Sequence, residues 1–188
     1  MAQSDKDNAR LQGGGAIRSG KAHLRLWLIA GLGWAADWAS KAWILKVLGD
    51  HESGYLREPI VIIPDYLRLV TVLNPGAIWG MAAGKTIFLI SASILGLVFL
   101  FWFFYTSRPD QWLTHSAIGM LIAGDLGNLY DRLFNNGKVV DFIEVNLHFR
   151  PVDPWPLFNI ADMLLCLGVG ILLVSVFAAQ KADHQKTE

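Results

Sequence analysis

The stretch TIFLISASILGLVFLFWFFYT, from Thr86 to Thr106, decides the class of this protein because it contains no charged side chain. A helix rises 1.5 Å per residue, so about 20 apolar residues cross the roughly 30 Å hydrocarbon core of a bilayer. The stretch therefore predicts a membrane-spanning helix, and we expect the chain to be an integral membrane protein.

The composition of the whole chain agrees with this interpretation. Of 188 residues, 53% are hydrophobic and only 17% are charged, which is too apolar for an ordinary soluble domain. Sixteen basic residues balance sixteen acidic ones, and no basic stripe appears, so we expect no nucleic-acid partner. The single cysteine, Cys166, excludes an internal disulfide. We expect a monomer whose surroundings are membrane lipid.

Three further apolar stretches flank the first one, at about residues 24–48, 112–129 and 158–179. The first and second of these contain charges, but each approaches the length of a span. With residues 86–106 they predict an all-α polytopic protein with one four-helix transmembrane domain over residues 23–180.

The basic residues predict the orientation of the spans. Four spans place both termini on one side, and the flexible lead of residues 1–22 and the tail of residues 181–188 are rich in Lys and Arg. By the positive-inside rule these ends are cytoplasmic. The longer connections, residues 49–85 and 130–157, then face outward.

The first outer connection has its own pattern. Its sequence EPIVIIPDYLRLVTVLNPGAIWGMAAG, residues 58–84, is rich in β-branched and aromatic residues and is broken by Pro and Gly. This composition predicts short strands, so we expect a small sheet on the outer membrane surface.

Two polar motifs lie within the predicted spans, where an ionisable side chain must be paired or functional. Asp37 and Lys41 are four residues apart and share a helix face. They are either a self-neutralising pair that lets the helix insert or part of a site. In GDLGNLYDR, three polar residues occupy neighbouring helical positions at the outward end of the third span; they are Asn128, Asp131 and Arg132.

Two aspartates come from different segments at one membrane depth. Asp141 lies in the extended-looking stretch KVVDFIEV, and Asp162 follows Asn159 by three residues at the start of the last span. Capping of the helix N-terminus would also explain Asp162. Two adjacent carboxylates can share one proton, so that one activates water and the other polarises a carbonyl. The pair therefore indicates a hydrolytic site.

The sequence lacks the residue patterns that metal-dependent and serine hydrolases require. The five histidines are scattered without metal-ligand spacing, and no G-x-S-x-G elbow is present. We therefore expect no metal and no cofactor. A proton- or ion-coupled transporter remains an alternative, with a relay through Asp37, Asp125 and Asp162. A non-catalytic membrane scaffold, with these polar groups as packing contacts, is a second alternative.

Five motifs occur together in one order: DWASK, NPGAIWG, GDLGNLYDR, VVDF and FNIAD. In this order and at these span positions the chain resembles signal peptidase II, the bacterial lipoprotein signal peptidase family, from about Leu24 to Ala179. The resemblance implies four transmembrane helices, a small β-cradle on the outer face and a short amphipathic outer helix.

The resemblance also implies an activity. Asp141 and Asp162 would be the catalytic aspartates of an intramembrane aspartic endopeptidase of the bacterial inner membrane, with the active site near the outer face. Its substrates would be diacylglyceryl-modified prolipoproteins, cleaved just before the lipidated cysteine. The residues implied to line or support the site are Asn74, Gly124, Asn128, Arg132, Asn159 and Ala161, with Asp37 and Lys41 nearby.

Three residues depart from the family's usual pattern. Pro75 and Trp79 stand on the rim of the expected cradle, and Asp125 stands where the family normally has a small uncharged residue. None of these changes removes a catalytic residue, but they bear on specificity and inhibitor response.

Overall fold

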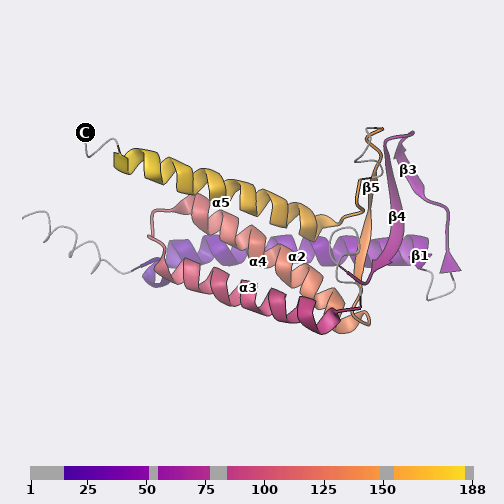
Figure 1. Cartoon of the computed structure of the whole chain (residues 1–188), viewed down its shortest axis with the longest axis horizontal. Coiled ribbons are helices and arrows are strands. Elements are labelled where there is room, and N and C mark those ends of the chain that lie inside the picture. The colour runs from indigo at the N-terminus through magenta and orange to yellow at the C-terminus, as the bar shows by residue number, and fades with distance from the viewer. Residues whose placement is uncertain (1–14, 51–54, 77–83, 149–154, 185–188) are drawn as a thin grey trace, which may run out of the picture.

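The computed structural model describes residues 15–50, 55–76, 84–148 and 155–184. In these residues four long α-helices run side by side along the long axis, and strands stand across one end of the bundle (Figure 1). The expected helical architecture with a small sheet is confirmed. The short helix η1 (Ala16–Arg18) precedes the four helices, which are α2 (Gly20–Leu48), α3 (Thr86–Thr106), α4 (Trp112–Phe134) and α5 (Ile160–His184).

Helix α3 is long and apolar enough to cross a membrane by itself, and α5 contains a shorter apolar run, Ile160–Ser175. Most of α3 is not covered by protein: Ile87, Phe99 and Trp102 all face outward. Such a uniformly apolar exposed surface fits a lipid environment.

Helix α4 lies between α3 and α5 and packs on α2 (Figure 1). Two glycines permit this close approach. A Cβ at Gly124 would lie 2.5 Å from the carbonyl oxygen of Ala161 on α5. A Cβ at Gly127 would overlap the carboxylate of Asp37 on α2. The small residues therefore let three helix backbones converge in the half of the bundle that is nearer the sheet.

The sheet joins the two long connections. Strands β1 (Gly49–Asp50) and β2 (Tyr55–Leu56) form a two-stranded ladder. The larger sheet is antiparallel with the order β3-β4-β5. Its strands are β3 (Ile60–Ile63), β4 (Leu67–Asn74) and β5 (Val139–Val145).

The expected short amphipathic helix does not appear in the described residues of the two long connections. The described part of the second connection contributes β5, and α4 continues beyond the predicted end of the third span to Phe134. Elsewhere in the described parts of both connections the chain forms strands and turns. Residues 77–83 and 149–154 are outside the described residues. Val139 and Val140 are both buried, and antiparallel pairing with β4 holds this segment in an extended conformation.

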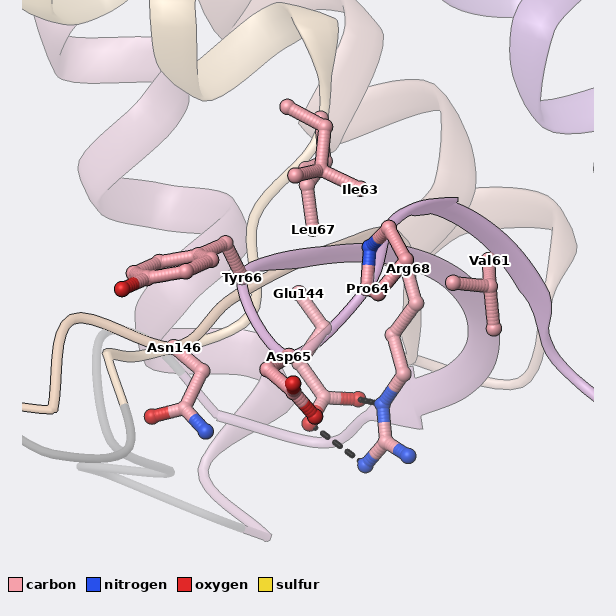
Figure 2. A pocket seen from close by; sticks show the side chains of 9 residues that line it. All are labelled: Val61, Ile63, Pro64, Asp65, Tyr66, Leu67, Arg68, Glu144 and Asn146. Atoms are coloured by element: carbon pink, nitrogen blue, oxygen red, sulfur yellow. Dashed lines mark hydrogen bonds and ion pairs between the residues drawn. The ribbon is translucent and has the colours of Figure 1, made fainter.

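A cavity of about 380 Å³ lies at the β3–β4 hairpin. Figure 2 shows the guanidinium of Arg68 on one wall, joined to the carboxylate of Glu144 by bonds of 2.8 and 2.7 Å. Glu144 is three residues beyond Asp141 on β5, or roughly 10 Å along an extended strand. Asp141 is not among the residues that line this cavity.

The two ends of the bundle give a test of orientation. Tyr66 lies at the sheet and Asp110 at the turn between α3 and α4, and both are exposed. We replace each by Cys, one at a time, in a Cys166→Ala chain. A membrane-impermeant thiol reagent applied to intact cells should label residue 66, and residue 110 only after permeabilisation. Labelling of both residues from one side would contradict the predicted topology.

Candidate active site

The structure brings Asp141 of β5 into a cluster of asparagine side chains. Its Oδ1 accepts a hydrogen bond from Nδ2 of Asn159 at 2.8 Å, and its Oδ2 accepts one from Nδ2 of Asn74 at 2.8 Å. The β4–β5 register explains the second contact, because Asn74 pairs with Val139, two residues before Asp141. Only 3% of Asp141 is exposed. Both carboxylate oxygens are therefore oriented by neutral donors.

Asp162 and Asn159 cap the start of α5 reciprocally. Oδ1 of Asn159 accepts from the backbone N–H of Asp162 at 3.0 Å, and Oδ2 of Asp162 accepts from the backbone N–H of Asn159 at 3.1 Å. This is the geometry of a capping box. Helix capping is therefore real, but it leaves the other oxygen, Oδ1, to accept from Nδ2 of Asn128 at 2.8 Å. Asn159 thus contacts both aspartates.

Burial raises the pKa of Asp141 to about 7. The negative charge of Asp162 acts in the same direction, while the hydrogen bonds from Asn74 and Asn159 oppose the shift. A carboxyl group with such a pKa holds its proton below about pH 7 and is a candidate general acid at neutral pH.

Lys41 lies behind the asparagines and is buried. Its Nζ is 2.8 Å from Oδ2 of Asp37, 2.9 Å from Oδ2 of Asp131 and 3.3 Å from Oδ1 of Asn128. An ammonium group has three N–H bonds, and this set matches all of them. The pair with Asp37 therefore exists, and the same lysine also reaches a side chain that binds Asp162.

The acids on either side of Lys41 hold the backbone next to the two aspartates. Oδ1 of Asp37 accepts from the N–H of Ala161 at 2.9 Å, and Oδ2 of Asp131 accepts from the N–H of Val140 at 3.0 Å. Asp131 was not among the site residues predicted from the sequence. Its position three residues after Asn128 could have indicated its role, because that spacing places both side chains on one face of α4.

The other predicted residues surround this cluster. Arg132 donates to the carbonyl oxygens of Asn128 at 3.3 Å and Gly76 at 3.1 Å, and so ties α4 to the segment after β4. Gly124 lies against Ala161. Pro75 is exposed, and Trp79 is outside the described residues.

Asp125 is not part of the cluster. Its carboxylate interacts with Ser93 of α3, while Asp37 is bound to Lys41 and to the α5 backbone. These separate partners do not form the relay that the transporter alternative requires. Within the described ranges, no three His, Cys, Asp or Glu side chains converge as metal ligands would.

Comparison with known proteins shows which family the chain is similar to. The family model described as signal peptidase (SPase) II matches residues 29–178. The chain belongs to the signal peptidase II family. The resemblance read from its five motifs is therefore confirmed, and the family is one of peptidases.

Named relatives of this signal peptidase II chain match over most of their length. The lipoprotein signal peptidase of Syntrophotalea carbinolica is 39% identical, over 80% of this chain and 89% of the relative. That of Desulfitobacterium hafniense is 36% identical, over 87% of this chain and 99% of the relative. A solved bacterial membrane enzyme has a TM-score of 0.66 at 32% identity, covering 81% of this chain and 87% of its own.

The Lys41 contacts predict a large loss of stability on mutation. In Lys41→Met the carboxylates of Asp37 and Asp131 lose their shared counter-charge, which costs about 3–5 kcal/mol for a buried pair. Lys46 is exposed on the same helix, so Lys46→Met is the matched control. Thermal unfolding in detergent should show a much lower Tm for Lys41→Met than for Lys46→Met. Equal Tm values would mean that the Lys41 contacts do not stabilise the protein.

Proposed function

We propose that the protein is a membrane aspartic endopeptidase that removes the signal peptide from diacylglyceryl-modified prolipoproteins, by cleaving before the lipidated cysteine. The relatives named lipoprotein signal peptidase support the substrate class. The observation that carries the mechanism is the Asn159 side chain, which donates to Asp141 and is bonded reciprocally to Asp162. Two carboxylates from separate elements thereby face one small region.

The two aspartates are placed in different surroundings, which assigns them different roles. Asp141 has a pKa of about 7 because of burial and supplies the proton. Asp162 receives two N–H donors at the first turn of α5, where the helix N-terminus favours a negative charge. Asp162 is therefore the general base, and Asp141 is the general acid.

The carboxylates keep room for a water and a peptide carbonyl. Each of their four oxygens accepts one hydrogen bond from an asparagine side chain or backbone. A carboxylate oxygen has two lone pairs, so each retains one acceptor site. Water bound to Asp162 loses a proton to it and attacks the scissile carbonyl carbon, whose oxygen takes the proton of Asp141. In the collapse the C–N bond breaks, the cysteine nitrogen takes the proton held by Asp162, and one hydroxyl of the gem-diol returns its proton to Asp141, so both aspartates regain their starting states.

The membrane supplies the positioning of the substrate. In this proposal all four helices cross the bacterial inner membrane, both termini are cytoplasmic, and the aspartates lie near the outer face in a monomeric enzyme. The acyl chains of the lipidated cysteine stay in the outer leaflet and hold the scissile bond at that depth. Such positioning reduces the entropy lost in bringing peptide and carboxylates together.

Amide substitutions test the assignment of the two aspartates. Asp141→Asn and Asp162→Asn should each lower the cleavage rate by at least about 10³-fold, since an amide cannot exchange the required proton. Asp110→Asn, at the opposite end of the bundle, is the control. The rate is measured as release of signal peptide from a diacylglyceryl-modified prolipoprotein by purified protein. A folded variant of either aspartate with near-normal activity would disprove the mechanism.

The pKa of Asp141 predicts the alkaline side of the pH profile. Asp141 must be protonated to act, and its pKa of about 7 means that the proton is lost as pH rises through 7. The specificity constant kcat/KM, which reports groups of the free enzyme, should therefore fall about tenfold per pH unit above that point. A rate that stays constant from pH 6 to 9 would refute the role of Asp141 as the acid.

A further inference from the structure

Asp125 is a partly buried acidic side chain of α4 that the proposed mechanism does not use. It lies on α4 three residues before Asn128, which binds Asp162. We infer that Asp125 accepts a hydrogen bond from the last residues of the signal peptide and selects a hydroxyl-bearing side chain there. This inference rests on the proposed function and names a specificity determinant for it.

The position of Asp125 relates it to the aspartate pair. Asp125, Asn128 and Arg132 are at positions i, i+3 and i+7 of α4 and so form one stripe on the helix. Asp125 and Asn128 are about 4.5 Å apart along the helix axis, a distance that one to two residues of an extended peptide span. A peptide whose scissile bond lies at Asp162 therefore brings a neighbouring residue to Asp125.

The bonding of Asp125 is incomplete. Its Oδ2 is shielded from solvent and accepts no hydrogen bond from the described residues, and the Ser93 hydroxyl of α3 is the neighbour that interacts with the carboxylate. On the facing turn of α3, a Cβ at Gly96 would still be 3.8 Å from Oδ2. A carboxylate in such a setting costs folding free energy unless it serves a function.

Arg132, at the other end of this stripe on α4, has a hydrogen-bond donor that complements the acceptor of Asp125. Nε of Arg132 is also buried and donates to none of the described residues. Asp125 and Arg132 are about 10.5 Å apart along the helix axis, which is the length of about three extended residues. In the proposed topology, Oδ2 of Asp125 is thus an unused acceptor on the deeper side of Asp162, and Nε of Arg132 is an unused donor on the outer side.

The direction of the substrate decides which part of it meets Asp125. Helix α4 runs outward toward Phe134 in the proposed topology, so Asp125 is deeper in the membrane than Asn128. The residues before the scissile bond come from the membrane side, and they are the ones at that depth. A hydroxyl is a small neutral donor, so it enters an apolar bundle at lower desolvation cost than an ammonium group. Serine or threonine is therefore the residue favoured next to Asp125.

The test compares matched lipidated substrates with the full-length enzyme in detergent. A diacylglyceryl-modified prolipoprotein has alanine at the three positions before the cysteine, and three derivatives carry a single serine at each position in turn. We expect the wild type to prefer serine at one position by roughly tenfold in kcat/KM. Asp125→Ala should reduce that ratio to about 1, and Asp125→Asn, which keeps one acceptor oxygen, should reduce it partly.

Two controls separate recognition from structure. Asp65→Ala removes an exposed acid on the β3–β4 hairpin and should keep the wild-type ratio. Ser93→Ala removes the α3 neighbour of Asp125 and should keep the preference as well, whereas a purely structural Asp125–Ser93 contact would lower the stability of both variants without changing the ratio.

The outcomes distinguish this inference from the proposed function. Cleavage without a serine preference, or a preference retained in Asp125→Ala, overturns the inference alone. Loss of folded protein in both Asp125 variants would assign the side chain to the α3–α4 contact and also overturn it. Failure of the wild type to cleave any of the four lipidated substrates would refute the proposed function and the inference with it.

Discussion

The buried ammonium group of Lys41 is the contact on which the arrangement of the polar cluster depends. It joins α2 to α4 through Asp131 and Asn128, and it fixes Asp37 on its own helix. The carboxylates of Asp37 and Asp131, which contact Lys41, accept hydrogen bonds from the backbone N–H groups of Ala161 and Val140. Each of those residues is the immediate neighbour of one aspartate of the pair. In a medium of low dielectric constant, one cation therefore holds both segments in place.

Charge and hydrogen bonding are divided between two layers. The side chains that touch the aspartates directly are neutral amides, namely Asn74, Asn128 and Asn159. Amide donors orient a carboxylate without adding a full positive charge beside it. A lysine in direct contact with Asp141 would favour its ionised form. The layered arrangement orients both carboxylates while the full positive charge stays one layer away.

The sequence predicted the helical class well because apolar length is a local property, as residues 86–106 show. The contact between Asp141 and Asn74 is different, since 67 residues separate them and the β4–β5 register brings them together. The resemblance could place both near a site, but only the fold supplies the hydrogen bond. Asp131 was noted as a polar residue at the end of the third span, but its partners, Lys41 and the backbone of Val140, come from α2 and β5 and could not be read from the sequence. The apolar span was predicted to end near residue 129, and the helix itself continues to Phe134, with Asp131 buried in the bundle.

The capping box of α5 has a dynamic consequence. Helix ends open more readily than helix centres, and local opening of one turn needs far less free energy than unfolding of the bundle. Here the first turn contains Asp162, so fraying of that turn would separate its carboxylate from Asn128 while the rest of the fold stayed intact. The bond from Asp37 to the N–H of Ala161 fastens this turn to α2 from the other side. The position of the Asp162 side chain therefore depends on the local stability of one helical turn as well as on that of the whole fold.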